Sequence, residues 1–500
     1  MTVEKGPTMT DHLFAAADLG ATSGRVILGR LTSECFLLEE VHRFPTPSIT
    51  IDGHLHWDAD ALVNQIVHGV RLAAANGPLE GIGVDTWGVD YGRLDSSGSL
   101  LEQPYNYRDA RTNGVPESFF ADFPPEDLYA QAGLQVMEFN TIFQFVSSAG
   151  DPGWAHTDTC LFLPDLFTYW LTGSKHAELT IASTSGLLDV AARGWSKVTL
   201  DHVRTRYDLD LAPVLPPIVE PGTVVGEIRP EILDTPTPVI AVGSHDTASA
   251  IAAVPASTRN FAYISSGTWS LVGLELDHPI LTEESRRADF TNELGIDGTV
   301  RYLRNVMGLW VLTESQRHWT SQGLESNLLE LLHSASLLPA LTTVVDMEDP
   351  RLLPPGDMPS RLAQMALETG QPVPGSPAEF TRCILDSLAL GYRRVIRQAM
   401  ELAGVDVEVV HIVGGGCRNR LLNQLTAETT GLTVITGPAE GTALGNLLVQ
   451  ARATGALSGS LMDLRQISYA SCELTTYTPG MLNLTETHWD RVEQRAFGRS

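Results

Sequence analysis

The sequence predicts an α/β protein with two large domains. Five hundred residues exceed what one hydrophobic core normally holds, so two domains are the natural expectation. Short apolar runs rich in β-branched residues alternate with longer stretches of helical periodicity, which is typical of α/β folds. Two similar hairpins, with turns around Thr22 and Thr268, lie about half the chain apart. This spacing indicates an internal duplication in which a hairpin opens each half.

The composition is that of a globular protein without a broad polyanion-binding surface. Hydrophobic residues make up 43% of the chain, charged residues make up 19%, and the formal net charge is −27. That charge argues against a nucleic-acid groove, so any phosphate must be held locally by backbone N–H groups, a metal ion or a few cations. The five cysteines lack the spacing of a zinc site or a disulfide framework. With neither a signal peptide nor a membrane-length apolar run, we expect a cytoplasmic enzyme.

The first element is a hairpin with a polar turn at residues 18–25. Glycines such as Gly20 let a ligand approach the backbone, and Thr22 and Ser23 place hydroxyl groups beside exposed N–H groups, which suits a phosphate. Asp18, at the end of the first strand, could hold Mg²⁺ directly or through water. For this segment taken alone, a plain glycine-rich turn with Asp18 as turn former is an equally good interpretation.

A helix and a polar strand follow the hairpin. Residues 56–75 have apolar positions at helical spacing and end at an Asn-Gly helix stop. Residues 81–92 lack the glycine spacing of a dinucleotide site, and no segment ends in the Gly-Lys-Ser/Thr of a P-loop. Residues 81–92 instead carry groups suited to hydrogen-bond hydroxyls and stack a sugar face, with a core tryptophan as the alternative. These residues are Asp85, Thr86, Trp87, Gly88 and Asp90.

Further along, polar and amphipathic segments lead towards the middle of the chain. Arg108, Asp109 and Arg111 are interpreted as a surface ion-pair network. Residues 133–144 and 162–173 are both predicted as helices.

The centre of the chain holds the candidate catalytic residue. Residues 239–242 predict a buried strand, and a helix of small residues is predicted from Ala248. His245, Asp246 and Thr247 then lie at a strand-to-helix corner, where side chains project beyond the carboxyl end of the strand and α/β folds place chemistry. Asp246 is therefore the candidate general base. The alternative is that Asp246 only caps the helix, since Asp is a favoured N-cap.

The second half repeats the hairpin around residues 265–268, and a nucleotide could sit between the two hairpins. Residues 338–377 are rich in Pro, Asp and Gly and are predicted to run over the surface before a long amphipathic helix. A strand at 407–413 runs into three glycines from Gly414, where the missing Cβ atoms would let a base or a phosphate lie against the backbone. Residues 433–436 are predicted as the last strand.

Six motifs together resemble those of the FGGY carbohydrate kinases of the actin-like ATPase superfamily. They occupy residues 18–25, 83–90, 244–250, 264–271, 305–310 and 411–417. Phosphate hairpins are shared across the superfamily, whereas the strings His-Asp-Thr-Ala-Ser-Ala and Asp-Thr-Trp-Gly-Val-Asp are far more specific. These strings are similar to those of family members that phosphorylate L-rhamnulose. The resemblance covers about residues 13–480 and implies two ribonuclease-H-like domains, 13–255 and 256–480, flanking a cleft for ATP and sugar.

The resemblance also implies an activity and a set of site residues. The γ-phosphate of ATP, with Mg²⁺ at Asp18, would pass to the 1-hydroxyl of L-rhamnulose in L-rhamnose catabolism, with Asp246 as the base. Residues implied to contact ATP are Ala21, Thr22, Ser23, Gly24, Arg25, Thr268 and Gly415. Residues implied to contact the sugar are Gly88, His245, Asp246, Thr247 and Asn305. One departure is Thr313, which stands where family members can present a Gln to the nucleotide.

Two alternatives remain open from the residues. The first is a kinase for another ketose, such as fuculose or xylulose, because pocket chemistry rather than fold sets the substrate. The second is a non-kinase actin-like ATPase that couples its nucleotide state to a partner and hydrolyses ATP without sugar. For the kinase, the expected partners are the ketose and ATP, without nucleic acid or membrane, in a monomer or a homodimer.

Overall fold

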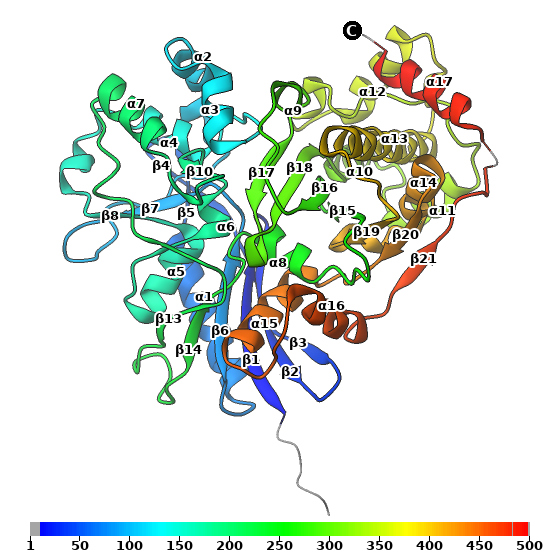
Figure 1. Ribbon diagram of the computed structural model, residues 1–500. Helices are drawn as coiled ribbons and strands as arrows, with labels where there is room; N and C mark the ends of the chain where they lie inside the picture. The colour runs from blue at the N-terminus through cyan, green and yellow to red at the C-terminus, as the bar shows by residue number, and fades with distance from the viewer. Residues whose placement is uncertain (1–10, 483, 499–500) are drawn as a thin grey trace, which may run out of the picture. The chain divides into compact units, whose positions relative to one another are not determined.

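The structure is a computed structural model that describes residues 11–482 and 484–498 (Figure 1). These residues form two compact units, and each unit is assembled from separate stretches of chain. Unit 1 comprises the described residues up to Ser257, Leu276–Arg301 and Gly441–Cys472. Unit 2 comprises Thr258–Glu275, Tyr302–Glu440 and the described residues from Glu473 onward. The division into domains 13–255 and 256–480 stays a prediction, because compactness measures packing rather than domain ancestry.

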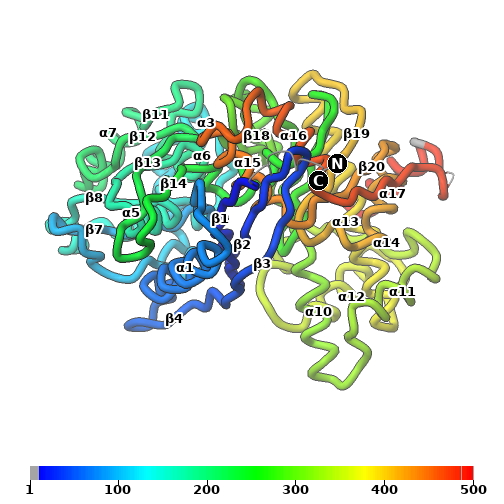
Figure 2. Tube along the Cα trace, turned by 90° about the horizontal axis from the view of Figure 1, so that it is seen from below, coloured from blue at the N-terminus to red at the C-terminus, as the bar shows by residue number. Residues whose placement is uncertain are grey.

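Unit 1 is organised around a six-stranded sheet with the order β13-β14-β6-β1-β2-β3. β1 and β2 form the predicted antiparallel hairpin, and β6 and β14 continue the sheet in parallel with β1. β13 and β3 pair antiparallel with their neighbours at the two edges, and Figure 2 shows β1, β2 and β3 side by side. The strands are β1 His12–Leu19, β2 Ser23–Leu31, β3 Phe36–Pro45, β6 Gly81–Thr86, β13 Thr223–Glu227 and β14 Pro238–Ala241.

Helices and short strands complete unit 1, and the predicted helices over residues 56–75 and 162–173 are present as α1 and α5. The prediction for 133–144 is wrong over 133–140, because Gly133 ends α3 in the left-handed conformation (φ 63°) and the next helix starts at Thr141. The helices are α1 Ala59–Ala74, α2 Val115–Phe120, α3 Pro125–Ala132, α4 Thr141–Ser147, α5 Leu163–Thr172, α6 Leu179–Ala182, α7 Lys197–Tyr207, α8 Asp246–Ala252, α9 Glu283–Arg287, α15 Gly441–Ala453 and α16 Leu461–Ala470. The short strands are β4 Ser48–Ile51, β5 His54–Trp57, β7 Tyr91–Leu94, β8 Thr159–Phe162, β9 Ala177–Glu178, β10 Leu188–Asp189, β11 Gly194–Trp195, β12 Ile218–Val219 and β17 Thr291–Leu294. The 3-10 turns are η1 Ala110–Thr112, η2 Pro152–His156 and η3 Ile296–Gly298.

Strand β1 is buried on both faces, which explains why its sequence is apolar without alternation. Leu13, Ala15 and Ala17 belong to the hydrophobic cluster that includes the buried face of α1. Phe14 and Ala16 belong to the cluster that includes α15. Figure 1 shows α15 beside β1 and β6, although it follows β1 by more than 400 residues. The C-terminal stretch 441–472 therefore covers one face of the N-terminal sheet.

Unit 2 contains six of the seven strands of a second sheet, in the order β18-β16-β15-β19-β20-β21, and a set of covering helices; the seventh strand, β17, stands next to β18 in the strand order. Two predictions fail here. Residues 338–377 contain the helix α12, whose Leu362 and Ala366 are buried, and residues 433–436 are followed by one more strand, β21. The strands are β15 Phe261–Ser266, β16 Trp269–Leu276, β18 Val300–Met307, β19 Val409–Val413, β20 Thr433–Thr436 and β21 Thr475–Tyr477. The helices are α10 Trp310–Ser321, α11 Leu328–Ser336, α12 Met358–Glu368, α13 Pro377–Ala403, α14 Arg420–Thr430 and α17 Glu486–Phe497, with the 3-10 turns η4 Pro350–Leu352 and η5 Gly415–Arg418.

Apart from the extra strand β17, which stands next to β18 in the second sheet, the two sheets repeat one topology. In unit 1 the order β3-β2-β1-β6-β14-β13 places a hairpin, then two parallel strands, then an antiparallel edge strand. In unit 2 the order β18-β16-β15-β19-β20-β21 places a hairpin, two parallel strands and an antiparallel edge strand in the same sequence. The internal duplication inferred from the two hairpins is therefore visible strand by strand.

Within the described residues, we find no helix that combines the length and the apolar character needed to cross a membrane.

Candidate active site

Three carboxylates of unit 1 lie where neighbouring parallel strands end. Asp18 is at the end of β1 and is paired in register with Asp85 of β6. Asp246 follows β14, and its neighbour His245 bridges to Thr86 at the end of β6. Carboxyl ends of parallel strands meet at one edge of a sheet, so the three side chains share one region. Asp18 contributes to raising the pKa of both Asp85 and Asp246, which places their charges within electrostatic range.

Asp246 is the first residue of α8 rather than its cap. His245 occupies the N-cap position and makes no side-chain cap hydrogen bond, so the capping interpretation of Asp246 is wrong. The Asp246 side chain is 31% exposed, and its Oδ1 accepts the hydroxyl of Thr247 at 3.0 Å. Burial raises the pKa of Asp246, His245 opposes that shift, and Asp18 adds to it. A carboxylate with a raised pKa and an accessible edge has the properties of a general base.

The backbone of this corner is pinned by residues that the sequence pattern did not reveal. Glu178 accepts the Ser244 N–H at 3.2 Å, and Thr180 Oγ1 accepts the His245 N–H at 3.2 Å. Glu178 also accepts the N–H and hydroxyl of Thr180, so one buried carboxylate joins the start of α6 to the corner. Burial raises the pKa of Glu178 to about 7 against these donors. A Glu before a short helix predicts a local cap, but not a partner 66 residues away.

Asp85 is fully buried, and only one of its two carboxylate oxygens accepts a hydrogen bond from the described residues. Its Oδ2 accepts the Asn446 amide at 2.5 Å, whereas Oδ1 has no hydrogen-bond partner in the described part of the chain. Burial raises the pKa of Asp85 well above its usual range, and the nearby Asp18 raises it further. Asn446 in turn accepts from Gln450, which also donates to the Ala15 carbonyl. Through Asn446 and Gln450, helix α15 therefore holds Asp85 and the end of β6 in place.

Asp18 faces its hairpin partner Arg25. The Nε and Nη2 atoms of Arg25 donate to Asp18 Oδ2 at 3.0 and 2.8 Å. The predicted metal-binding residue and a predicted ATP-contacting residue thus form one ion pair. Among the described residues, no three acidic, His or Cys side chains lie close enough to hold one ion directly. Oxygen donors on Asp18, with an unpaired Asp85 Oδ1 nearby, suit Mg²⁺, which usually keeps several waters and takes one or two carboxylates.

The β1–β2 turn presents amide groups rather than carbonyl groups. Thr46 donates to the Gly20 and Thr22 carbonyls at 2.8 and 3.3 Å, which occupies the acceptors of the turn. No hydrogen bond in the described chain engages the N–H groups of Ala21 or Thr22, and Thr22 is exposed. Gly24 instead serves packing, since a Cβ there would lie 2.5 Å from the Phe44 ring. Ala21 and Thr22 therefore offer the donors that a phosphate needs.

The corresponding turn of unit 2 consists of Gly267 and Thr268. It is exposed and contacts the start of α10. The Thr268 carbonyl accepts the Trp310 N–H at 3.2 Å at the start of α10. Asn305 lies half-buried on β18, and Thr313 donates its hydroxyl to the Leu309 carbonyl one turn back. Thr313 is exposed, so its short side chain leaves an open surface at the position of the family Gln.

The three glycines after β19 have different roles. Gly414 has a positive φ of 81°, and a Cβ on Gly416 would lie 2.0 Å from Ser266 Oγ of the hairpin strand. These two glycines are required by backbone shape and close packing. Gly415 is exposed and has no atom within 4 Å of an added Cβ. Gly415 is therefore the one of the three whose open space can accommodate a ligand.

The Trp87 cluster is part of the core. Trp87 is 6% exposed, and its indole N–H donates to Asp90 Oδ2 at 2.9 Å. Trp57 donates to the same oxygen at 2.6 Å, and Gln144 donates to Oδ1 at 3.0 Å. Burial raises the pKa of Asp90 to about 6 despite these donors. Of the two interpretations of Trp87, the buried tryptophan is the one observed, whereas the neighbouring Gly88 remains half-buried against Thr184.

Asp90→Asn is expected to lower the free energy of unfolding by about 1–3 kcal/mol at pH 7, because one acceptor becomes a donor facing Gln144. The raised pKa of Asp90 favours the folded state at low pH, and that contribution is lost as pH rises from about 4 to about 6. The variant lacks this dependence, so its deficit should be larger at pH 4 than at pH 7. Urea unfolding at both pH values measures the difference.

Asp95→Asn is the control for that measurement. Asp95 Oδ1 alone accepts the three hydrogen bonds of a surface turn, and an Asn keeps this oxygen. A loss below about 1 kcal/mol is expected for the control. An equal loss in both variants would contradict the role assigned to Asp90.

The arginine loop does not form the predicted ion-pair network. Asp109 contacts His54 at 3.0 Å and accepts the Leu55 N–H at 2.8 Å. Arg111 donates to Gln144 at 2.8 Å and stacks over the Tyr105 ring at 3.9 Å. The prediction was wrong because residues close in sequence found partners on β5 and α4 instead.

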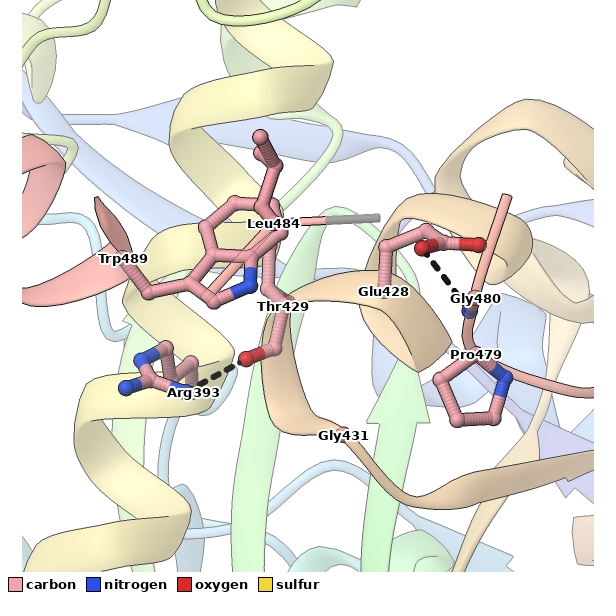
Figure 3. A pocket seen from close by; sticks show the side chains of 8 residues that line it. All are labelled: Arg393, Glu428, Thr429, Gly431, Pro479, Gly480, Leu484 and Trp489. Carbon is pink, nitrogen blue, oxygen red and sulfur yellow. Dashed lines mark hydrogen bonds between the residues drawn. The ribbon is translucent and has the colours of Figure 1, made fainter. Parts of the chain in front are cut away.

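A separate pocket of about 460 Å³ in unit 2 is lined by residues of α13, α14 and the C-terminal segment (Figure 3). Its charged groups serve structure: Arg393 donates to the Thr429 carbonyl and Glu493, and Glu428 accepts the N–H groups of Gly480, Met481 and Leu482. Figure 3 shows two of these bonds, from Arg393 to the Thr429 carbonyl and from the Gly480 N–H to Glu428. The pocket is therefore not part of the candidate site.

A duplicated sheet, with carboxylates at strand ends beside a turn that exposes amide groups, is the arrangement of an α/β enzyme that handles phosphate groups. The models of the FGGY family of carbohydrate kinases match residues 13–252 with the N-terminal domain and residues 262–454 with the C-terminal domain. The chain belongs to the FGGY family of carbohydrate kinases. It is accordingly a phosphotransferase that uses ATP, and the alternative of a non-kinase ATPase is set aside.

Curated relatives are similar over nearly the whole chain. The rhamnulokinase of Bacteroides thetaiotaomicron is 40% identical over 473 residues, which cover 93% of this chain and 96% of the relative. The rhamnulokinase of Enterococcus faecalis is 41% identical over 452 residues, covering 89% and 90%. The rhamnulokinase of Pectobacterium carotovorum is 39% identical over 488 residues, covering 96% and 95%. The resemblance inferred from the six motifs is confirmed.

Solved structures confirm the fold class. Xylulose kinase from Rhodospirillum rubrum superposes with a TM-score of 0.79 at 16% identity, covering 97% of each chain. Gluconate kinase from Lactobacillus acidophilus gives a TM-score of 0.77 at 14% identity, covering 97% of this chain and 96% of that one. Because the sequence identity is so low, the similarity to these structures supports the actin-like ATPase fold alone.

Proposed function

We propose that this protein phosphorylates L-rhamnulose at its 1-hydroxyl with ATP, giving L-rhamnulose 1-phosphate and ADP in L-rhamnose catabolism. The observation that carries the proposal is the 39–41% identity, over nearly full length, to three proteins that are rhamnulokinases. Solved structures of a gluconate kinase and of xylulose kinases are similar at only 14–17% identity, which favours the rhamnulose assignment over a xylulose one.

Asp246 is proposed as the general base. In phosphoryl transfer the protein mainly aligns the reactants and stabilises charge, so the base needs to orient the acceptor hydroxyl and take its proton as the oxygen attacks. The exposed edge of Asp246 supports this role, because its Oδ1 is held by Thr247 while the side chain stays 31% accessible. The sugar would contact His245, Thr247, Gly88 and Asn305, as the family resemblance implies.

The nucleotide would contact the two hairpin turns. The free amides of Ala21 and Thr22 and the open backbone at Gly415 support phosphate and nucleotide contacts at these positions. Ser23, Gly24, Arg25 and Thr268 complete the proposed set. Asp18 is proposed to hold Mg²⁺ through water, with Asp85 nearby. When bound, the ion would neutralise charge on the phosphates of ATP.

The site must exclude water while ATP is bound, because water could otherwise attack the γ-phosphate in place of the sugar hydroxyl. We therefore expect the sugar to stimulate ATP turnover strongly.

A panel of ketoses tests the substrate. Release of ADP is measured with purified protein, ATP and Mg²⁺ in the presence of L-rhamnulose, L-fuculose, D-xylulose or no sugar. The expected result is a kcat/KM for L-rhamnulose at least about 10-fold above that for either other ketose, since a pocket that hydrogen-bonds hydroxyls discriminates against wrong stereochemistry. A higher value for another ketose would reassign the substrate. Equal turnover with and without sugar would reject the kinase assignment.

A further inference from the structure

A buried ion pair contacts the imidazole ring of His245. Glu293, on β17, and Arg301, on β18, approach to 2.9 Å between Oε2 and Nη1. Their side chains are only 8% and 1% exposed. Arg301 also donates through Nε and Nη2 to the Leu294 carbonyl at 3.2 and 3.1 Å. The family motifs include neither residue, and the proposed mechanism so far uses neither.

The ion pair holds one imidazole nitrogen of His245 in place. Both Nη1 and Nη2 of Arg301 lie 3.2 Å from His245 Nδ1 with hydrogen-bond geometry. A guanidinium has donors but no acceptor, so Arg301 serves Nδ1 when that nitrogen is bare, whereas the neighbouring carboxylate serves Nδ1 when it is protonated. Glu293 Oε2 lies 3.1 Å from the same Nδ1. Although burial opposes its ionisation, Arg301 and His245 lower the pKa of Glu293 to about 2, so Glu293 remains the counter-ion of Arg301.

The other imidazole nitrogen faces the proposed base. His245 Nε2 lies 3.5 Å from Asp246 Oδ1, the oxygen that also accepts the Thr247 hydroxyl. An N–H on Nε2 would hold this oxygen and leave Oδ2 for the acceptor hydroxyl. A bare Nε2 would instead set a lone pair against the carboxylate and repel it. The position of the His245 ring and a proton on Nε2 therefore decide how Asp246 is oriented.

We propose that Arg301, held by Glu293, is a positioning residue for phosphoryl transfer: it fixes the His245 ring through Nδ1, turns Nε2 towards Asp246 Oδ1 and so orients the carboxylate of Asp246. The proposal rests on the proposed function, because it assigns Asp246 as the base. Burying an ion pair is costly, and such pairs contribute little net stability compared with apolar replacements. A role in orienting the corner explains why this pair is placed against His245.

A double-mutant cycle tests the proposal. Arg301→Lys keeps the charge but loses the planar fork that reaches Nδ1, and it is expected to lower kcat about 10-fold or more with little change in the KM for ketose. His245→Gln supplies an amide N–H near the position of Nε2 but has no second ring nitrogen for Arg301 to hold. In the His245→Gln background, Arg301→Lys should change kcat by less than about 2-fold, because the interaction it supported is no longer present.

Arg382→Lys is the matched control. Arg382 is also a buried arginine that pairs with a carboxylate, Asp386, and donates to main-chain carbonyls, in unit 2. It should lower the unfolding midpoint without changing kcat more than about 2-fold. If Arg301→Lys does not fold, Glu293→Gln replaces it in the cycle with the same expected pattern.

Three outcomes would overturn the proposal: equal losses of kcat for Arg301→Lys in the wild-type and His245→Gln backgrounds, a loss of stability with unchanged kcat, or an effect confined to KM. Each marks a merely structural or substrate-binding role. The wild-type protein separates this failure from that of the proposed function. Activity on L-rhamnulose establishes the substrate before any variant is made, and if another ketose is preferred, the cycle is run with that ketose.

Discussion

Asp246→Asn is expected to lower kcat about 10²- to 10⁴-fold while the KM for ketose changes little. The amide has nearly the same shape, so it keeps the Thr247 contact of Oδ1, but it cannot accept the proton of the acceptor hydroxyl. A loss of this size corresponds to the contribution of a positioned general base. Steady-state kinetics with the preferred ketose, together with binding of the ketose measured by calorimetry, separates lost chemistry from lost affinity.

Asp60→Asn is the control for that experiment. Asp60 lies in the first turn of α1, as Asp246 lies in the first turn of α8, and it is exposed. Its replacement should leave kcat within about 2-fold of the wild-type value, because Asp60 is an exposed helix residue and not one of the strand-end carboxylates. Near-normal turnover of Asp246→Asn with intact ketose binding would show that another group is the base.

Gly445→Ala is expected to destabilise the protein by about 3 kcal/mol or more. A Cβ at Gly445 of α15 would lie 1.8 Å from the Ser249 carbonyl oxygen and 2.6 Å from its carbon, both backbone atoms of α8. Backbone cannot yield as a flexible side chain does, so the two helices must separate. Figure 1 shows α8 beside α15, and the two helices pack directly against each other. Urea unfolding should show a much lower midpoint.

The same substitution should also reduce kcat in whatever fraction remains folded. α8 carries Asp246 at its first residue, so a displaced helix misplaces the base, and a shift near 1 Å costs about 10²-fold. Gly391→Ala, within α13, is the matched control because an added Cβ meets nothing within 4 Å. This control should stabilise the protein by up to about 1 kcal/mol, as Ala replaces Gly inside a helix. Similar stability for both variants would disprove the packing argument.

A row of hydrogen bonds from Gln450 through Asn446 to Asp85 links the packing of α15 to the carboxylates at the strand ends. Gly81 and Gly83 of β6 leave room for Gln450 and Asn446, since a Cβ on Gly83 would lie 2.4 Å from Asn446 Oδ1. Asn446 then reaches Asp85, the carboxylate between Asp18 and the His245 corner. The small residues of the segment that begins α15 thus serve packing, and that packing orients one of the site carboxylates.

Local patterns predicted the parts of the site that depend on chain direction alone. The Gly-Ala-Thr-Ser-Gly turn between two apolar runs predicted the β1–β2 hairpin, and the run before Gly243 predicted the strand and corner that carry Asp246. Patterns failed where neighbours in sequence take distant partners, as Asp109 and Arg111 do. They also failed where an irregular composition hides a short helix, as in α12.

The sequence by itself determined the α/β class, the two matching hairpins and the position of Asp246 at a strand end, because each depends on local periodicity and on glycine or β-branched residues within one segment. Only the tertiary structure decided which distant groups complete the corner: Glu178, Glu293, Arg301 and Asn446 come from three separate stretches of the chain and carry no shared pattern. Their partners are set by packing of sheet and helices, which closes loops of tens to hundreds of residues. Hydrogen bonds across such loops exist only once the chain has folded.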